Sequence, residues 1–329
     1  MPEIKLEIFD AIIIGVGQSG SPLALALAEK DYKVALIEKN KVGGSCINYG
    51  CTPSKTMMAS AAVAETVRQA VHFGVEAEIK NINFLKIIKR KNDIVNQFRK
   101  GLEKSLKEED FVELIYGTAT FVDKYTIQVK AEEGQDRKLK AEKIFINTGA
   151  MPDIPEINGL ESVSYLTSTT IMELTEIPDH LLIIGGSYIG LEFGQMFKRF
   201  GSKVTIIEHG SQLVGKEDKD VAGELIGILE EEGIDIILKA AVEKAEKNDG
   251  KVVLEVAVGK KQQNITGSHL LIATGVKPNT EALNLKAAGI KVNKKKYIEV
   301  DDHLETNVEN IYAMGDVKGG PAFTHISYD

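Results

Sequence analysis

The chain contains two cysteines, Cys46 and Cys51, with only four residues between them. A disulfide across so short a loop adds little stability, because the entropy it removes from the unfolded chain grows with loop length. The pair is therefore suited to reversible thiol and disulfide chemistry. Thr52 and Pro53 have the pattern of a helix N-cap and first helical residue, since proline's missing N–H costs nothing there. Cys51 would then lie at the positive end of the helix dipole, which favours a thiolate.

Two other interpretations of the cysteines stay open. They could be unrelated buried thiols, which are common in proteins, or half of a zinc site. Zinc is the weaker alternative, because the six histidines are scattered singly and there is no second cysteine pair. We therefore predict no metal site.

A second signal is an internal repeat. Residues 11–20 are an apolar run that ends in a G-x-G-x-x-G turn, and residues 33–38 form a second apolar run that ends in an acid. Residues 181–190 and 203–208 repeat this arrangement 170 positions later, and in both copies the first glycine precedes the acid by 23 residues. One glycine motif is weak evidence, whereas two complete units with equal spacing predict two dinucleotide-binding units.

Each unit offers the groups that a dinucleotide needs. The glycines let the backbone approach a pyrophosphate, the helix N-terminus stabilises its charge, and the acid accepts hydrogen bonds from an adenosine ribose. The first copy predicts cofactor contacts from Gly15, Gly17, Gln18, Ser19, Gly20, Glu38 and Lys39. The second copy predicts contacts from Gly185, Gly186, Ser187, Tyr188, Ile189, Gly190 and Glu208. It departs from the fingerprint at Ser187, where the middle glycine belongs. The alternative is that both are only tight strand-to-helix turns.

Glu208 also bears on the choice of nicotinamide cofactor. A carboxylate about 4 Å from a 2′-phosphate would be repelled by about 4 kcal/mol at an effective dielectric constant of about 20. With a plain ribose it would instead gain a charged hydrogen bond of about 1.5 to 3 kcal/mol. NAD(H) is therefore predicted and NADP(H) is less favoured, although His209 and Lys203 nearby soften the preference.

Composition limits the function classes. Of the 329 residues, 43% are hydrophobic and 27% are charged, and the formal net charge is −8. The length suits two domains, and the acidic balance argues against nucleic acid as a partner. No apolar run reaches membrane-spanning length, and the N-terminus does not resemble a signal peptide. We expect no membrane association and a cytoplasmic location.

The order of the segments predicts an α/β fold with two Rossmann-like nucleotide-binding domains. Residues 1–150 form the first domain and residues 151–279 the second, while residues 280–329 return to the first domain and begin a central one. Each nucleotide-binding domain closes with a Thr-Gly pair after an apolar strand, at residues 148–149 and 274–275.

These motifs resemble those of the two-cysteine flavoprotein disulfide reductases, the family of dihydrolipoamide dehydrogenase, glutathione reductase and mercuric reductase. The resemblance covers the whole chain in the family's order, from the glycine motif and the cysteine segment to Ile-Tyr-Ala-Met-Gly-Asp at residues 311–316. It implies FAD in the first domain and NAD(H) in the second. For FAD it implies further contacts from Asp316, at the ribitol, and from Gly44, Ser45, Lys55, Gly117, Thr118, Ala119, Thr148, Gly149 and Ala150. For NAD(H) it implies a further contact from Gly275.

The resemblance also implies roles for the reactive residues. Cys51 is the charge-transfer thiol beside the flavin, and Cys46 is the outward thiol that attacks the substrate. Lys55 lies one helical turn beyond Cys51 on the same face, and it pairs with Glu192 close to the flavin. The alternative is that both are surface residues of charged helices. Tyr188 matches the aromatic residue that gates the nicotinamide pocket.

The chain departs from the family at its C-terminus. Family members continue into a further domain that forms the dimer interface and supplies a His-Glu acid–base pair, whereas this chain ends at Asp329. The resemblance implies a homodimer for the full-length form, and the chain as given is compatible with a monomer. We expect both cofactors to bind, and we expect the missing acid–base pair to cost about 10² to 10⁴ in rate. His325 matches a position near the flavin and is not assigned as the base.

The predicted function is an FAD-dependent oxidoreductase that passes electrons from NADH to a Cys46–Cys51 disulfide and on to a small disulfide or a metal ion. Two alternatives stay open. One is an NADH diaphorase or oxidase that uses the flavin without the cysteines, and the other is a redox-sensing flavoprotein without turnover. Lipoamide, glutathione, a related disulfide and mercuric ion all remain candidate acceptors.

Overall fold

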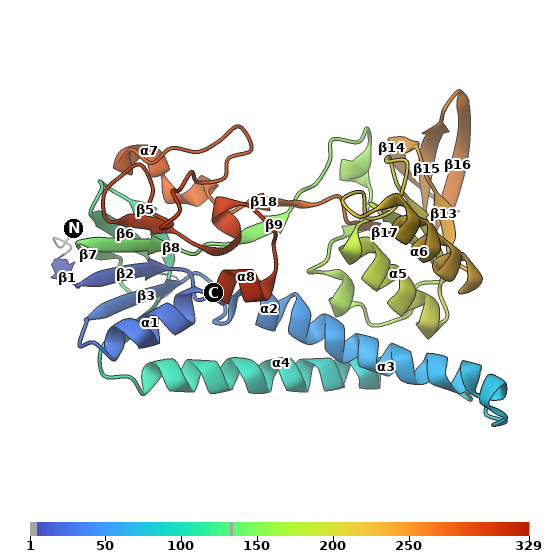
Figure 1. Ribbon diagram of the computed structural model, residues 1–329, viewed down its shortest axis with the longest axis horizontal. Helices are drawn as coiled ribbons and strands as arrows, with labels where there is room; N and C mark the ends of the chain where they lie inside the picture. Colours follow the sequence, from blue (N-terminus) through green and yellow to red (C-terminus); the bar gives the residue numbers. More distant parts are fainter. Residues whose placement is uncertain (1–4, 132–133, 329) are drawn as a thin grey trace. The chain divides into compact units, whose positions relative to one another are not determined.

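The structure, a computed structural model, describes residues 5–131 and 134–328. The chain divides into two compact units (Figure 1). The first consists of Met1–Thr52, Val95–Met151 and Val276–Asp329, and the second of Pro53–Ile94 and Pro152–Gly275. Each unit combines a parallel sheet with helices, so the predicted α/β fold class is confirmed.

The first unit is built around a five-stranded parallel sheet in the order β19-β8-β2-β3-β4. These strands are β2 (Ala11–Ile14), β3 (Val34–Glu38), β4 (Val112–Tyr116), β8 (Lys143–Ile146) and β19 (Ile311–Ala313). Helix α1 (Gly20–Ala28) connects β2 to β3 and covers one face of the sheet (Figure 1). The side chains of β2 are at most 4% exposed and alternate between two core clusters, as expected for a parallel sheet that is covered on both faces.

The connection from β3 to β4 carries the cysteines. It runs through α2 (Gly44–Asn48), α3 (Cys51–Gln69), a 3₁₀ turn (Ala70–Phe73) and α4 (Phe84–Lys107). Because α3 begins at Cys51, the prediction that Thr52 caps this helix and Pro53 opens it is wrong in register. Proline is tolerated further into the first turn, since none of the first four N–H groups has an intrahelical partner. Cys51 still lies at the positive end of the helix.

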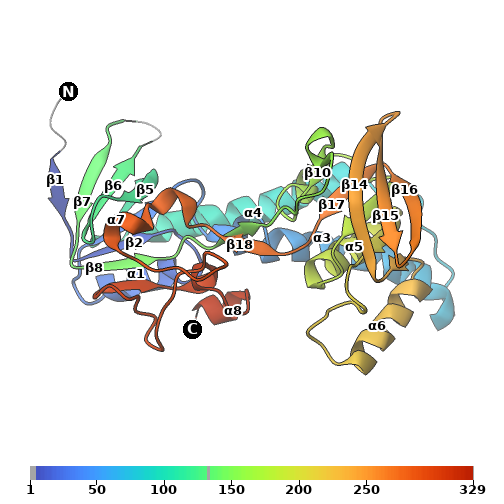
Figure 2. The same ribbon diagram turned by 90° about the horizontal axis from the view of Figure 1, so that it is seen from above.

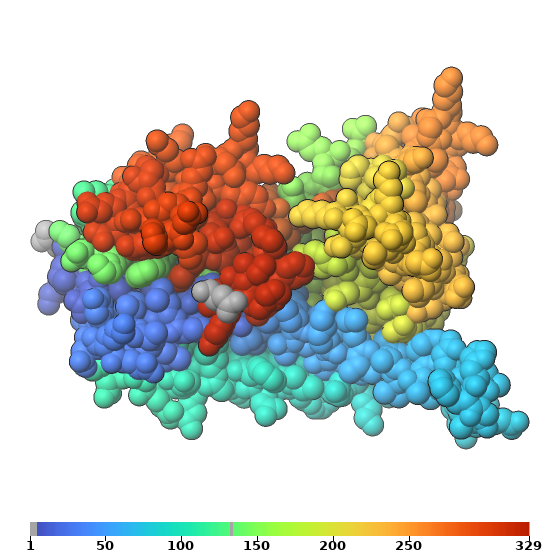
Figure 3. Space-filling model, in the orientation of Figure 1, coloured from blue at the N-terminus to red at the C-terminus, as the bar shows by residue number. Residues whose placement is uncertain are grey.

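Shorter elements complete the first unit. An antiparallel extension has the strand order β1-β7-β6-β5, in which only the β1–β7 pair is parallel. The remaining elements are β1 (Leu6–Ile8), β5 (Thr118–Phe121), β6 (Thr126–Lys130), β7 (Arg137–Lys140), β9 (Ala150–Pro152), β18 (Val276–Pro278), α7 (Leu285–Ala288), α8 (Thr324–Tyr328) and 3₁₀ turns at Glu281–Leu283 and Gly315–Lys318. The dark red C-terminal segment, which includes α8, lies at the surface (Figure 3).

The second unit repeats the plan of the first. Its parallel sheet has the order β10-β17-β11-β12-β13, and an antiparallel sheet, β14-β15-β16, adjoins it (Figure 2). The strands are β10 (Tyr165–Leu166), β11 (His180–Ile184), β12 (Lys203–Ile207), β13 (Asp235–Ile237), β14 (Ala240–Asn248), β15 (Lys251–Val258), β16 (Lys261–Gly267) and β17 (His269–Ile272). The helices are α5 (Tyr188–Phe200) and α6 (Lys219–Glu231), with 3₁₀ turns at Leu160–Ser162 and Ile171–Glu173. Helix α5 occupies the place that α1 has in the first unit.

One segment packs differently from the sequence-based division. Pro53–Ile94 belongs to the second compact unit, whereas the sequence analysis assigned these residues to the first domain. The physical reason is aromatic packing, because the Phe84 ring centroid lies 6.1 Å from that of Phe197 and 5.6 Å from that of Phe200. Met57 is fully buried in the same core cluster. Among the described residues, no helix has the length and apolar character needed to cross a membrane.

Candidate functional site

The first glycine loop is tied directly to the acid that ends β3. The backbone N–H of Val16 donates to Glu38 Oε2 at 3.0 Å, and the N–H of Asn40 donates to Glu38 Oε1 at 2.9 Å. Glu38 is only 8% exposed, and burial raises the pKa of its carboxyl while these hydrogen bonds oppose the rise. The predicted pyrophosphate loop and the predicted ribose ligand are therefore neighbours at the carboxyl edge of the sheet.

The same loop contacts the start of the cysteine segment. A side chain on Gly44 would place its Cβ 2.8 Å from the Cα of Gly17, so these two backbones approach closely. The Gln18 side-chain amide donates to the Gly43 carbonyl at 3.2 Å. Helix α2, which carries Ser45 and Cys46, thus begins against the glycine motif.

The sequence analysis missed Asn147, which lies at the centre of this loop cluster. Its carboxamide donates to the Gly15 carbonyl at 3.2 Å. A Cβ on Gly17, Gly20 or Gly315 would lie 3.0, 2.7 or 3.0 Å from that carboxamide. Gly15 has φ +105°, and a Cβ there would lie 2.3 Å from the Asn147 backbone oxygen. The available signal was a polar residue at the end of an otherwise apolar strand.

The Thr148-Gly149 closure is held by a second residue that the sequence analysis missed, Asn279. Thr148 Oγ1 donates to the Asn279 carbonyl at 2.8 Å, and the Asn279 side-chain amide donates to the Thr148 carbonyl at 2.9 Å. The Asn279 N–H also donates to the Gly149 carbonyl at 3.0 Å. On the other side of the sheet edge, the Gly117 N–H donates to the Glu38 carbonyl at 2.9 Å, which leads into Thr118 and Ala119 of β5.

Asp316 lies in the 3₁₀ turn after β19 and is half-buried. Burial raises the pKa of its carboxyl, and a hydrogen bond from Ser327 opposes the rise. The Ser19 hydroxyl donates to the Ser327 carbonyl, so Ser327 connects the glycine loop to this acid. Helix α8 therefore joins the predicted cofactor residues of the first unit.

Cys46 is half-buried and Cys51 is exposed, and both side chains are thiols in this structure. The hydroxyl of Thr324 lies 3.1 Å from Cys51 Sγ. A hydrogen bond with Cys51 raises the pKa of the Cys46 thiol well above its ordinary range, burial raises it further, and a hydrogen bond with Thr324 opposes both.

The second unit reproduces the link between glycine loop and acid. The Gly186 N–H donates to Glu208 Oε2 at 2.7 Å, and the Gly210 N–H donates to Glu208 Oε1 at 2.6 Å. Gly185 has φ +111°, and a Cβ there would lie 2.4 Å from the Ala273 carbonyl oxygen. His209 Nδ1 also lies 3.0 Å from Glu208 Oε1.

The departure at Ser187 has a local explanation. In the first unit, a Cβ on the middle glycine would meet the Asn147 carboxamide, whereas Ala273 occupies the corresponding place after β17. The small alanine leaves room for the Cβ of Ser187, which is exposed at the start of α5. The following residue, Tyr188, is 43% exposed.

Lys55 and Glu192 form an ion pair between α3 and α5 within the second unit. Their side chains are 56% and 35% exposed, so the pair adds at most about 1 kcal/mol to stability. Its consequence is geometric, because it fixes the direction of the Lys55 ammonium group.

The remaining predicted contacts lie beside these groups. Lys39 is exposed next to Glu38, Ala150 begins β9, Ile189 lies in the first turn of α5, and a Cβ on Gly190 would lie 2.1 Å from the Gly185 carbonyl oxygen. Gly275 has φ +132°, and its carbonyl accepts from the Asp153 N–H at 3.0 Å.

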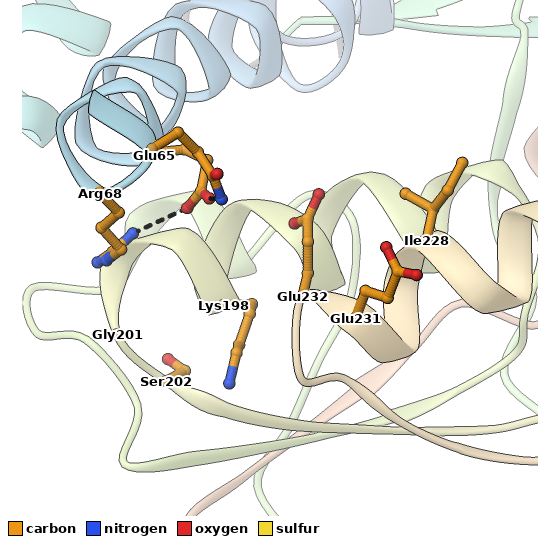
Figure 4. Close-up of a pocket in the computed structure, with 9 residues that line it drawn as sticks. Glu65, Arg68, Lys198, Gly201, Ser202, Ile228, Glu231 and Glu232 are labelled. Atoms are coloured by element: carbon orange, nitrogen blue, oxygen red, sulfur yellow. Dashed lines mark hydrogen bonds and ion pairs between the residues drawn. The ribbon is translucent and has the colours of Figure 1, made fainter. Parts of the chain in front are cut away.

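The second unit contains a pocket of about 690 Å³ (Figure 4). Residues near the end of α3, among them Glu65 and Arg68, line it together with residues at the ends of α5 and α6. None of the predicted site residues lines this pocket. In the described part of the chain, no group of three or more His, Cys, Asp or Glu side chains is arranged to hold a metal ion.

Comparison with known proteins identifies the family of this chain. Residues 9–329 match the family model "Pyridine nucleotide-disulphide oxidoreductase". The chain is 40% identical over 324 residues to the probable pyridine nucleotide-disulfide oxidoreductase RclA of Escherichia coli, covering 98% of this chain and 68% of that protein. It is 36% identical over 319 residues to the mercuric reductase of Lysinibacillus sphaericus, covering 97% of this chain and 58% of that protein.

A third relative is the dihydrolipoyl dehydrogenase of Geobacillus stearothermophilus, which is 32% identical over 318 residues, covering 96% of this chain and 67% of that protein. Among solved structures, the Cu(II) complex of the HOCl-induced flavoprotein disulfide reductase RclA from Escherichia coli superposes with a TM-score of 0.88 at 38% identity. It covers 98% of this chain and 68% of that one. The chain thus spans between 58% and 68% of the length of these proteins.

The raised pKa of Asp316 predicts a pH dependence of stability. Burial penalises the ionised carboxylate in the folded protein, so this penalty is absent below the carboxyl's ordinary range and grows as pH rises through the raised pKa. We expect the stability of Asp316→Asn relative to the parent to increase as pH rises from the ordinary pKa of an aspartate, about 4, through the raised pKa of Asp316. Urea unfolding at several pH values, without added cofactor, measures this difference.

The exposed Asp302→Asn is the matched control, and it should follow the parent at every pH. Parallel profiles for Asp316→Asn and the parent would show that burial does not penalise this carboxylate.

Proposed function

Since this chain belongs to the pyridine nucleotide-disulphide oxidoreductase family, we propose that it passes two electrons from NADH, through FAD, to a Cys46–Cys51 disulfide and on to a small disulfide or metal ion. Enzymes of this family use FAD and NAD(P)H. One observation carries the proposal. The cysteine segment begins in direct backbone contact with the first glycine loop, where Gly44 meets Gly17.

The first unit would hold FAD. Its glycine loop leads into the N-terminus of α1, where Ser19 makes no side-chain cap hydrogen bond, so this end of the helix suits a pyrophosphate. Glu38 would accept hydrogen bonds from the adenosine ribose. Asp316 would receive the ribitol hydroxyls, whose donated hydrogen bonds would offset the cost of burying its charge. Bound FAD would supply two-electron transfer between the nicotinamide and the disulfide.

The dithiol is suited to the next step by the difference between its sulfurs. Reduction of a Cys46–Cys51 disulfide takes up two electrons and one proton, and it leaves one thiol and one thiolate. We propose that the proton stays on Cys46, whose pKa is raised by its hydrogen bond with Cys51 and by burial, and that the negative charge lies on Cys51, at the positive end of α3. Cys46 must lose its proton before it attacks a substrate disulfide, because the thiolate is the nucleophile.

The second unit would hold the nicotinamide cofactor, with NADH preferred. Glu208 already accepts from two backbone N–H groups, yet a carboxylate offers about four acceptor sites. Capacity therefore remains for the two hydroxyls of a ribose, whereas a 2′-phosphate would meet a fixed negative charge. Lys55, oriented by Glu192, is proposed to act near the flavin.

A metal ion is the second candidate acceptor, and the relatives supply the reason. Two of the proteins described above are a mercuric reductase and an RclA structure in complex with Cu(II). Thiolates are soft ligands that favour soft metal ions, and Cys46 and Cys51 provide two sulfurs on one unit. The proposed location is the cytoplasm, where a dithiol is kept reducible.

The cofactor preference is tested by Glu208→Gln, with the exposed Glu224→Gln on α6 as the matched control. Removing the fixed charge should lower the ratio of kcat/KM for NADH to that for NADPH by at least about tenfold, which corresponds to about 1.4 kcal/mol. Steady-state kinetics with both cofactors measures the ratio. An unchanged ratio in Glu208→Gln would remove this carboxylate from the specificity argument.

The role of the cysteines is tested by Cys46→Ser. We expect loss of NADH-dependent reduction of lipoamide, glutathione disulfide and Hg²⁺, because all three need the dithiol. Reduction of a dye, which takes electrons directly from the flavin, should continue. If disulfide or metal reduction survives in Cys46→Ser, the diaphorase interpretation replaces the one proposed here.

A further inference from the structure

Thr324 is the first residue of α8, and it lies against the thiols. Its Oγ1 is 3.1 Å from Cys51 Sγ, and it also forms a hydrogen bond with the Cys46 thiol. Neither the glycine motifs nor the cysteine spacing marks this residue, which lies 273 positions after Cys51. All three residues belong to the first compact unit.

The direction of this hydrogen bond depends on the charge of the sulfur. Between a neutral thiol and a hydroxyl, either group can donate. Once Cys51 has lost its proton, the thiolate can only accept, so the Thr324 hydroxyl must be the donor. A hydrogen bond to an ionised group is shorter and about twice as strong as a neutral one. The contact therefore becomes strongest in the reduced and ionised state of the pair.

Helix α8, which carries the hydroxyl, makes further contacts within the first unit. Further along the helix, the Ser327 carbonyl accepts from the Ser19 hydroxyl, and Ser327 forms a hydrogen bond with Asp316. The rings of the two residues that flank Thr324, Phe323 and His325, stack with centroids 5.7 Å apart. Thr324 is thus a fixed donor on an anchored segment.

The ionisable groups around the pair are few in the described part of the chain. From α2, Cys46 is in contact with Cys51. From the C-terminal segment, the ionisable groups are Asp316, which is bound to Ser327, His325, which is stacked on Phe323, Lys318 and Tyr328. Along α3, the next charged group after Cys51 is Lys55, whose ammonium is paired with Glu192.

We propose that Thr324 is a positioning residue of the dithiol, whose hydroxyl donates to the Cys51 thiolate and helps to determine which sulfur carries the negative charge. The inference rests on the proposed function, in which reduction of the disulfide creates that thiolate. A charge fixed on Cys51 keeps the proton on Cys46 until Cys46 reacts with a substrate.

The test is the ionisation of Cys51 alone. In a Cys46→Ser background only one thiol remains, so the ultraviolet absorbance of its thiolate reports Cys51 directly as pH is raised. Thr324→Val keeps the shape of the side chain and removes the hydroxyl. We expect it to raise the pKa of Cys51 by about one to two pH units, the size of one charge-assisted hydrogen bond. The rate of iodoacetamide alkylation at neutral pH should fall by about tenfold.

Thr324→Ser is the matched control, because it restores the hydroxyl, and it should titrate within a few tenths of a pH unit of the threonine protein. The proposal is overturned if Cys51 has the same pKa in Thr324→Val as in the threonine protein. It is also overturned if Thr324→Ser raises the pKa of Cys51 as much as Thr324→Val does. Circular dichroism checks the fold, and Thr324→Ala provides the same test if the valine variant does not fold.

Failure of this proposal is distinguishable from failure of the proposed function, because the titration needs neither flavin nor NADH. If Thr324→Val leaves the pKa of Cys51 unchanged and the protein reduces disulfides with NADH, only the role of Thr324 is rejected. If Thr324→Val raises the pKa of Cys51 but the cysteines take no electrons from NADH, the proposed function is rejected and the role of the Thr324 hydrogen bond stands.

Discussion

The structure depends on one interaction that occurs twice: a buried or half-buried carboxylate accepts hydrogen bonds from the glycine loop of its own unit. Glu38 binds the Val16 N–H, and Glu208 binds the Gly186 N–H. Each bond fastens the end of one parallel strand to the turn after its neighbour, so the loop and the acid reach the carboxyl edge of the sheet together. Open α/β sheets bind nucleotides at this edge. Other groups acquire their positions from it, including α2, which begins against Gly17.

The two units differ in what they add to this frame. The second unit connects β12 to β13 through α6, whereas the first connects β3 to β4 by the longer path through α2, α3 and α4. That path carries both cysteines, so the redox pair is an insertion at the nucleotide edge of one sheet. The C-terminal segment then returns to the first unit, and Thr324 reaches the sulfurs while Ser327 reaches Asp316. The proposed electron path thus depends on contacts between distant parts of the sequence.

Much of this arrangement could be predicted from the sequence, because strands, glycine turns and their acids follow local rules. The equal spacing of glycine and acid predicted the two pairs of glycine loop and carboxylate that form hydrogen bonds in the structure. Asn147, Asn279 and Thr324 were missed, since the hydrogen-bond partners described above lie at least 130 positions away in sequence and no local pattern reveals the contact. The start of α3 was misplaced because proline fits several positions of a first turn. The packing of Pro53–Ile94 depends on Phe84. Its aromatic partners, Phe197 and Phe200, are distant in sequence, so the contact is visible only in the folded chain.

The central claim is that the cysteine pair exchanges electrons with a flavin that NADH reduces. An anaerobic titration of the purified, FAD-loaded protein with NADH, followed by visible absorbance, tests it most directly. The account predicts uptake of about two electron pairs per chain and a long-wavelength band from thiolate-to-flavin charge transfer. Bleaching of the flavin after one pair, with no such band, would contradict the account and show that Cys46 and Cys51 lie outside the electron path.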